Sequence, residues 1–128
     1  MSRLSRLPYQ YVVLRCVPRV EREEFLNVGV VLYCEEAGVL ASAHHLDSPR
    51  LASFGSVDEA ALDAHLCFID AVCRGDEAVG SIARRPAGVR FGFLRAPRST
   101  VVQPGPVHGG STEDPTAEVE RLMARLVR

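Results

Sequence analysis

Two apolar runs and the polar loop between them decide the fold of this chain: residues 15–32 read Arg-Cys-Val-Pro-Arg-Val-Glu-Arg-Glu-Glu-Phe-Leu-Asn-Val-Gly-Val-Val-Leu. The flanking runs are apolar and β-branched, which favours two neighbouring strands. The loop carries five charged side chains followed by Asn27, which is more polar chemistry than a connection between strands requires. The stretch therefore predicts a pair of strands with a polar site at their connection.

The first of these strands extends back to residue 9, because residues 9–17 are aromatic and β-branched with no interruption before Pro18. Alternation leaves both of its faces largely apolar, so this strand is expected at the centre of a sheet. Arg15 is the exception on a covered face. A guanidinium there needs a carboxylate partner, and Glu24 or its neighbours are the nearest supply.

The remaining elements follow from periodicity and turn residues. Residues 28–35 predict a second strand, in which Gly29 marks a bulge or the close approach of another backbone. Further along the chain we expect a third strand at 39–44, a helical turn within 47–54, a helix from the capping box Ser56-Val57-Asp58-Glu59 to Arg74, an irregular segment at 76–98, a strand at 99–103, a loop at 104–110 and a last helix from Asp114-Pro115. Residues 89–94 fit either a strand or a short helix. The predicted fold is α+β, a small antiparallel or mixed sheet of three N-terminal strands and at least one later strand, with two main helices packed on it.

Length and composition bound the class of protein. The 128 residues, 47% of them apolar, are expected to form one domain, 1–128, that buries roughly two-thirds of the surface of its unfolded chain. No secretory leader and no apolar run near the roughly 18 residues of a membrane span are present, so we expect a cytoplasmic protein without membrane contact. Its four cysteines lie in apolar segments without a Cys-x-x-Cys pair, which is typical of reduced, buried thiols. We expect neither a metal nor another cofactor.

Every one of the 15 basic residues is arginine. A Walker A loop, a Schiff-base enzyme and a protein-kinase fold all require a lysine ammonium group. The sequence therefore excludes these three classes.

The charges are segregated along the chain although the net charge is only -1. Residues 1–20 carry four arginines and no acid, residues 21–77 carry twelve acids and three arginines, and residues 78–112 carry five arginines and no acid. The plain explanation is that basic and acidic segments pack beside one another; the alternative is an anionic partner for the basic segments.

The polar loop forms the first candidate site, which consists of Arg15, Arg22, Glu24 and Asn27. These residues can converge because a loop between paired strands brings its two ends together. Arginine forks backed by carboxylates suit the recognition of phosphate or carboxylate groups. The structural alternative is an ion-pair network that only holds the loop in place.

The second candidate site consists of Arg98, Ser99 and His108. Arginine and hydroxyl groups at the start of a strand can cradle an anion, and His108 can exchange a proton near neutral pH. A serine at a strand start and a histidine in a loop are also ordinary structural choices. No base is placed beside Ser99 by spacing, so no catalytic residue is predicted.

Two further patterns are weaker. The pair His44-His45 resembles a metal site, but adjacent residues of a strand point to opposite faces and cannot both face one ion without a bend. Within residues 78–112, Phe91 and Phe93 alternate with arginines, which can form a stacking surface for nucleic acid. Such phenylalanines more often belong to a core.

Residues 15–32 and 98–110 together resemble a bacterial family catalogued as domain of unknown function 3037. In that family a strand that ends in Arg and Pro leads to Arg-x-Glu-Phe-x-Asn-Val-Gly-Val, and the matching positions here are Arg15, Pro18, Arg22, Glu24, Phe25, Asn27, Val28, Gly29 and Val30. The likeness covers nearly the whole chain. Where the family has a tryptophan ahead of Arg-Ser-Thr this chain has Phe93, a difference expected to alter packing rather than chemistry.

The resemblance implies a single-domain protein, and some members stand beside genes for a kinase-like protein of the HipA toxin type. Our leading expectation is therefore a non-enzymatic module that binds a protein partner, plausibly such a kinase-like protein, through the polar loop and the Arg98 region. The first alternative is a small phosphate- or nucleotide-binding protein or enzyme built on Arg15, Glu24, Arg98 and His108. The second is nucleic-acid binding through residues 78–112.

Overall fold

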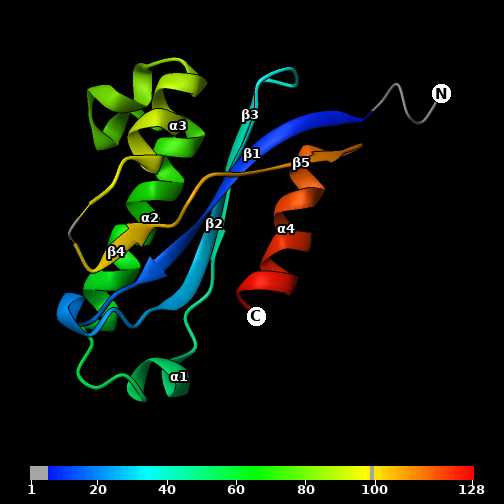
Figure 1. The fold of residues 1–128 in the computed structure, drawn as a ribbon. Helices are drawn as coiled ribbons and strands as arrows, with labels where there is room; N and C mark the ends of the chain where they lie inside the picture. Colours follow the sequence, from blue (N-terminus) through cyan, green and yellow to red (C-terminus); the bar gives the residue numbers. More distant parts are fainter. Residues whose placement is uncertain (1–5, 99) are drawn as a thin grey trace.

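A computed structural model describes residues 6–98 and 100–128. Along the chain its elements are β1 (Leu7–Cys16), η2 (Val20–Arg22), β2 (Leu26–Cys34), β3 (Val39–His44), α1 (Ser48–Ala52), α2 (Glu59–Arg74), η3 (Glu77–Val79), η4 (Ser81–Arg84), α3 (Ala87–Arg95), β4 (Val102–Pro104), β5 (His108–Thr112) and α4 (Pro115–Leu126). The fold is α+β, as predicted (Figure 1).

All strands join one antiparallel sheet with β1 at its centre. The order is β3-β2-β1-β4, and β5 also pairs with β1. The two short strands share one edge of β1, because β4 pairs with residues 14–16 of β1 and β5 pairs with residues 7–11. The central position of β1 agrees with the apolar character of both its faces.

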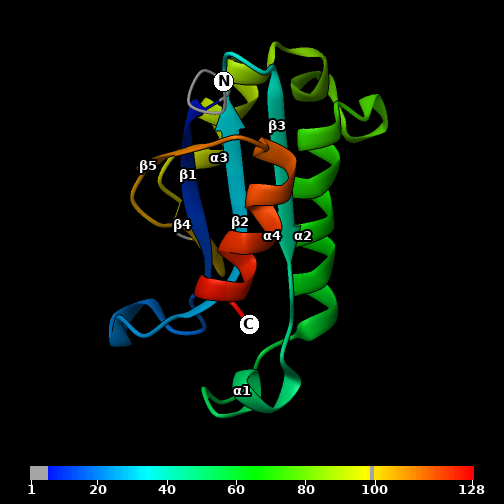
Figure 2. The ribbon, with the colours of Figure 1, turned by 90° about the vertical axis from the view of Figure 1, so that its right-hand side faces the viewer.

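Helices cover both faces of the sheet. Figure 1 shows α2 and α3 on one side and α4 on the other. Alternation along β1 sends Val12, Leu14 and Cys16 into the core under α2 and α3. Tyr9 points into the core under α4. In Figure 2, α4 lies over β2 and beside β3, which leaves the part of this face that belongs to β1 less covered.

The ends of the helices follow their capping residues. The Asp58 side chain accepts a hydrogen bond from the Ala61 amide and starts α2, so the helix begins after Asp58 rather than at Ser56. Gly75 ends it in the left-handed conformation with a φ of 73°, as predicted. Asp114 caps α4 by accepting a hydrogen bond from the Ala117 amide, with Pro115 as the first helical residue, also as predicted.

Residues 89–94, which fitted either a strand or a short helix, are helical and belong to α3. The second half of the chain differs from the prediction in two places. The strand expected at 99–103 starts only at Val102. The segment expected as a loop at 104–110 ends in β5, which carries His108. No helix within the described ranges is long and apolar enough to cross a membrane.

The cysteines are free, and three of them are buried: Cys16, Cys34 and Cys73. Cys67 is exposed, which corrects the expectation of four buried thiols. The reason is helical periodicity, because the buried stripe of α2 runs through Leu62, Leu66, Ile69 and Cys73 and passes Cys67 by.

Candidate functional site

A bulge in the central strand pair sets the position of Arg15. The register between β1 and β2 shifts between Leu14 and Arg15, so that Leu14 faces Gly29 while Arg15 faces Asn27. On its other side Arg15 faces Gln103 of β4. Directly opposed residues of antiparallel strands project to the same face. The bulge therefore places three polar side chains in one row across three strands, on the face that α4 partly covers.

Gly29 lies next to this bulge and in close contact with β3. A Cβ atom at this position would lie 2.7 Å from the Ala43 carbonyl oxygen of β3. The predicted close approach of another backbone at Gly29 is therefore confirmed.

The Arg15 guanidinium packs against Phe25 and Gly105. Its Cζ lies 4.0 Å from the centre of the Phe25 ring, which is the geometry of a cation–π contact. A Cβ atom added to Gly105 would lie only 3.1 Å from the same Cζ. The close backbone approach at Gly105 and the aromatic ring together fix the plane of the guanidinium.

Arg15 has no carboxylate partner in the described part of the chain. None of the ion pairs there includes it. Its Nε is buried and donates its hydrogen to no acceptor, which is a costly arrangement for a charged donor. The side chain is therefore held in place by packing, with its hydrogen-bonding capacity unused by the fold.

The prediction that Glu24 or a neighbouring carboxylate pairs with Arg15 is wrong. Glu24 Oε1 instead accepts a hydrogen bond from Arg22 Nε at 2.6 Å, and this bond holds the pKa of Glu24 below its usual value. The two residues are neighbours on the loop, so their pair forms without folding the loop back over the sheet. Phe25 takes the place beside Arg15 that the carboxylate was expected to fill.

The loop at 17–25 projects from the end of the sheet beside β4 (Figure 2). Its charges pair locally: Arg19 Nε lies 2.8 Å from Glu21 Oε1, beside the Arg22–Glu24 pair. For Arg22 and Glu24 these contacts agree with the structural alternative of an ion-pair network. Two large apolar side chains of the loop, Val20 and Phe25, are 55% and 43% exposed.

Asn27 acts as a tether for the last helix. Its Nδ2 donates a hydrogen bond to the Leu126 carbonyl at 3.0 Å. This satisfies one of the carbonyls that the C-terminal turn of α4 leaves without a partner. Asn27 thus lies beside Arg15 in the sheet, but its amide group is engaged with α4.

His108 lies on the same face as Arg15 and is exposed. It opposes Tyr11 across β1 and β5, and the two ring centres are 5.3 Å apart. Tyr11 precedes Arg15 by four residues of extended chain, which is about 13 Å. His108 and Arg15 therefore lie on one face, too far apart to share a small ligand such as phosphate.

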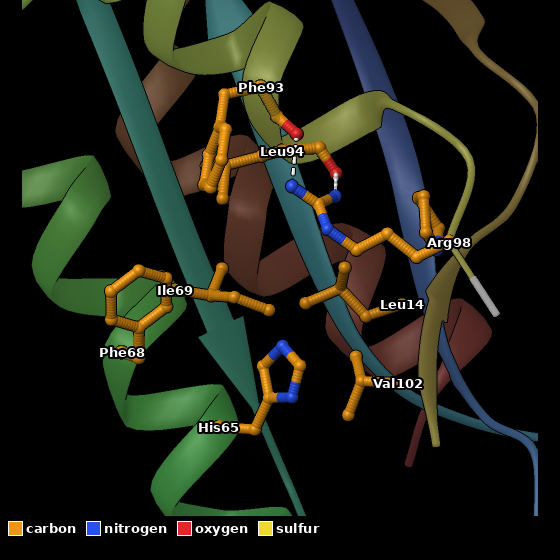
Figure 3. A pocket seen from close by; sticks show the side chains of 9 residues that line it. Leu14, His65, Phe68, Ile69, Phe93, Leu94, Arg98 and Val102 are labelled. Carbon is orange, nitrogen blue, oxygen red and sulfur yellow. Dashed lines mark hydrogen bonds between the residues drawn. The ribbon is translucent and has the colours of Figure 1, made fainter. Parts of the chain in front are cut away.

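Arg98 lies on the opposite face of the sheet (Figure 3). Its guanidinium donates hydrogen bonds to the carbonyl oxygens of Phe93 at 2.6 Å, Ala96 at 3.1 Å and Leu94 at 3.3 Å. These bonds close the C-terminal end of α3, where carbonyls lack helical partners. Both terminal nitrogens of Arg98 are therefore engaged by the fold. Ser99, the neighbouring candidate residue, lies outside the described residues.

A narrow hollow lies between Arg98 and His65, and Figure 3 shows both residues on its wall with Leu14 and Val102. Its volume is about 30 Å³, far below the roughly 300 Å³ of a small-molecule site. Burial, aided by the charge of Arg98, lowers the pKa of His65. The hollow can hold a water molecule but not a nucleotide.

The two candidate sites do not converge. Arg15 and His108 lie on the α4 face, whereas Arg98 lines the hollow under α2 and α3. The loop pair of Arg22 and Glu24 is separate from both. The structure thus separates the two candidate sites that the predicted functions combine. That any of these residues binds a ligand stays a prediction.

The basic segment 78–112 is largely occupied by the fold. Arg90 donates hydrogen bonds to the Val72 and Cys73 carbonyls at the end of α2, both at 2.8 Å. In the described residues, Arg84 with Glu77 is the one ion pair that joins this segment to the acidic segment 21–77. The arginines of the basic segment therefore contact backbone carbonyls more than they contact the carboxylates of the acidic segment.

The sequence did not reveal a buried polar contact that anchors α4. Glu118 is 6% exposed and accepts a hydrogen bond from the Tyr9 hydroxyl at 2.5 Å, and Arg121 pairs with the same carboxylate. Burial and the hydrogen bond to Glu118 raise the pKa of Tyr9 to about 12. The only signal was an acid on the apolar side of the last helix, one residue before Val119.

Sequence reasoning also missed the surroundings of His44. This residue lies between two aspartates of α2, 3.3 Å from Asp63 and 2.9 Å from Asp70, with Cys67 nearby. The signal was the spacing of Asp63, Cys67 and Asp70, at i, i+4 and i+7 on one helix.

The fold and these sites define a small α+β protein with an antiparallel sheet between helices. A family model described as Protein of unknown function (DUF3037) matches residues 11–127, nearly the whole chain. The chain belongs to this family, which confirms the resemblance. A search of curated proteins found no match, and a search of solved structures found none either.

Proposed function

We propose that this protein is a non-enzymatic module that binds a protein partner by receiving an acidic group of that partner on Arg15. One observation carries the proposal: the Arg15 guanidinium is fixed by Phe25 and Gly105 but has no carboxylate partner among the described residues. A guanidinium held in this way can donate hydrogen bonds to a carboxylate or a phosphate group. Little side-chain entropy remains to be lost when that group binds.

The surroundings of Arg15 support a protein as the partner. Phe25 is 43% exposed next to the guanidinium, and Val20 projects from the same loop. A planar cation surrounded by apolar side chains is typical of the central residues of protein interfaces, where arginine and aromatic residues are enriched. Arg15 is half-buried and Phe25 lies on the surface, a setting that suits a protein segment better than a small molecule, whose sites are concave.

The enzyme alternative has less support. It requires Arg15, Glu24, Arg98 and His108 around one substrate. Arg98 lies on the other face of the sheet, and Glu24 is paired with Arg22. These four groups do not meet at a common point.

The nucleic-acid alternative also has less support. The guanidinium groups of Arg90 and Arg98 are bonded to backbone carbonyls, and Phe91 is buried in the core. Few groups of the basic segment are left to contact phosphates or to stack on bases. A kinase-like partner, implied by the family resemblance, stays a prediction.

The test compares tagged wild-type protein with Arg15→Gln in the source organism, followed by quantitative mass spectrometry of the bound proteins. Arg22→Gln is the matched control, because it removes a guanidinium from the neighbouring loop. Gly105→Ala is a second variant, which keeps Arg15 but adds a Cβ where its guanidinium packs. Circular dichroism verifies that each variant is folded.

We expect one stoichiometric partner with the wild type and with Arg22→Gln. Its affinity, measured by calorimetry on the purified pair, should fall 10- to 100-fold in Arg15→Gln, because a hydrogen bond to a charged group contributes about 1.5–3 kcal/mol. Gly105→Ala should weaken binding in the same direction. Absence of a stoichiometric partner, or equal affinity of Arg15→Gln and the wild type, would contradict the proposal.

A further inference from the structure

Strand β3 and helix α2 bring five polar side chains together on the face of the sheet opposite α4. Figure 2 shows α2 running alongside β3. Ser42 and His44 project from β3 towards α2, because they are two residues apart on the strand. Asp63, Cys67 and Asp70 project from α2 towards β3, because they lie on successive turns of one helix face. Neither Arg15 nor the projecting loop takes part in this cluster.

Three of these side chains offer ligand atoms at one point. His44 Nε2 lies 3.3 Å from Asp63 Oδ1, and Cys67 Sγ lies 3.8 Å from Asp63 Oδ2. One ligand atom of each residue lies within 4.8 Å of the other two. The three groups are an imidazole nitrogen, a carboxylate oxygen and a thiol sulfur.

We propose that His44, Asp63 and Cys67 form a binding site for a divalent transition metal of the zinc type, with the fourth coordination position open to solvent. Asp70 is assigned as the positioning residue that holds the His44 ring. This site lies apart from the proposed partner-binding surface and does not depend on it.

The distances suit tetrahedral zinc. Ligand atoms at about 2.0–2.3 Å from a tetrahedral Zn²⁺ are separated from one another by about 3.3–3.8 Å. The contacts of Asp63 with His44 and with Cys67 have these lengths, but they involve its two different carboxylate oxygens, and one ligand atom of each residue lies within 4.8 Å of the other two. A tetrahedral centre therefore requires the three ligand atoms to move somewhat closer together. Asp63 is 56% exposed and Cys67 is also exposed, so rotation of these two side chains can close the remaining gap without moving the backbone.

Asp70 and Ser42 provide the support that histidine ligands commonly have. Asp70 Oδ2 lies 2.9 Å from His44 Nδ1, close enough for an ion pair, although its angle to the ring does not meet hydrogen-bond geometry. The other oxygen of Asp70 accepts a hydrogen bond from the Ser42 hydroxyl at 2.5 Å. A carboxylate on the second ring nitrogen directs Nε2 towards the metal and raises its basicity.

The burial of these side chains also suits a metal site that has one coordination position open to water. The His44 side chain is 18% exposed and Asp70 is 23% exposed, whereas Asp63 is on the surface. The histidine is thus a fixed ligand at the base of the cluster. A metal bound there keeps a face in contact with water, as in zinc sites with three protein ligands.

The ligand types select the metal. Thiolate and imidazole together favour zinc and related transition metals, while Mg²⁺ and Ca²⁺ prefer oxygen ligands only. Two carboxylates concentrate negative charge at the cluster. Partial loss of hydration and these carboxylates raise the pKa of the Cys67 thiol, which a bound cation reverses.

We expected no metal because the cysteines form no Cys-x-x-Cys pair and because His44 and His45, as neighbours on a strand, cannot face one ion. The partners of His44 come instead from a helix that follows 15 residues after β3 in the sequence, and only the packing of α2 on β3 brings them together.

The test is a titration of the reduced, untagged protein with Co²⁺ under argon, with a reductant that does not bind metals. Cobalt bound to a thiolate in a tetrahedral site gives a ligand-to-metal absorption band in the near ultraviolet and intense visible bands. We expect one equivalent of Co²⁺ to produce both bands and one equivalent of Zn²⁺ to remove them. A thermal-shift measurement with Zn²⁺ should show a higher Tm than with Mg²⁺.

Variants assign the ligands. Cys67→Ser, which changes an exposed side chain, should abolish the near-ultraviolet band, and His44→Gln and Asp63→Asn should each lower the affinity for Co²⁺ by more than 100-fold. Asp70→Asn should lower it 10- to 100-fold with the spectrum unchanged, the effect expected when a residue acts through a ligand. His45→Gln and Glu36→Gln are the matched controls and should bind like the wild type.

Each of the following results would contradict the proposed metal site. A spectrum without the thiolate band, or a Cys67→Ser protein with unchanged spectrum, removes Cys67 as a ligand. Equal losses in His44→Gln and in the control His45→Gln show adventitious binding to surface histidines. Partner binding can fail with the metal site intact, because the two proposals use different faces and different residues.

Discussion

The guanidinium groups of Arg15 and Arg98 have similar aromatic neighbours but different hydrogen-bond partners. Both guanidiniums pack on a phenylalanine, at 4.0 Å from the Phe25 ring and 4.6 Å from the Phe93 ring. Arg98 then donates to three carbonyls at the end of α3, whereas Arg15 makes no hydrogen bond through its buried Nε. The comparison teaches that the partners of a guanidinium, rather than its charge or its aromatic neighbour, distinguish a structural arginine from one available to a ligand.

The largest effect on stability is expected from Arg98→Ala. The change leaves the carbonyls of Phe93, Leu94 and Ala96 without their donor and should lower the free energy of unfolding by about 2 kcal/mol. Urea denaturation measures this as a lower midpoint with an unchanged m-value. Partner affinity should stay as in the wild type. A variant as stable as the wild type would show that Arg98 does not hold the end of α3.

Arg15→Ala should have a smaller effect on stability and a larger one on binding. It removes a partly exposed cation–π contact, which contributes about 0.5–1 kcal/mol, and it relieves the unsatisfied Nε. The same urea experiment on Arg15→Ala and Arg98→Ala makes the comparison direct. A loss for Arg15→Ala as large as that for Arg98→Ala would make Arg15 a structural residue and would weaken the proposed function.

The sequence predicted the first half of the fold better than the second, and the reason lies in particular glycines. The strands β1 to β3 have continuous apolar patterns that determine them locally. In α3, Gly88 lowers helix propensity, but a Cβ there would lie 3.1 Å from the Tyr33 hydroxyl. In β5, Gly110 interrupts the strand signal, but a Cβ there would lie 2.7 Å from the Tyr9 ring. Both glycines are explained by contacts with distant residues, which a local pattern cannot reveal.

The candidate sites show the same limit. The placement of Arg15 on a sheet face was predictable from alternation, but the bulge that sets it beside Asn27 and the local pairing of Glu24 were not. Arg98 was predicted as a candidate binding residue because of its charge. Its carbonyl partners depend on where α3 ends, which the sequence did not show. Residue types were therefore visible in the sequence, and their partners required the fold.

The third prediction uses His65 as a probe of the hollow beside Arg98. Burial and the Arg98 charge lower the pKa of His65 in the folded state, so the folded protein binds fewer protons than the unfolded chain. The resulting contribution to stability is present above the ordinary histidine pKa and is lost as the pH falls below it. It should be smaller than the effect of Arg98→Ala.

NMR titration of the His65 ring measures this pKa directly. In Arg98→Ala the pKa should rise, but only in part, because burial is the main cause of the shift. An unchanged pKa would show that the charge of Arg98 does not reach His65. In His65→Gln the loss of stability between neutral and mildly acidic pH should be smaller than in the wild type.

The smallest effect is expected from Arg22→Ala on the projecting loop. Its pair with Glu24 has a short distance of 2.6 Å, yet the side chains are 56% and 49% exposed, and water and salt screen their attraction. The free energy of unfolding should therefore change little. As in the control variant Arg22→Gln, the affinity for the partner should also stay as in the wild type, because an exposed charge near an interface acts mainly on the rate of encounter. Urea denaturation measures the stability, and calorimetry with the partner measures the affinity. A loss of stability as large as that of Arg98→Ala would place Arg22 among the residues that hold the fold. A loss of affinity as large as that of Arg15→Gln would make Arg22 part of the binding surface and would remove it as a control.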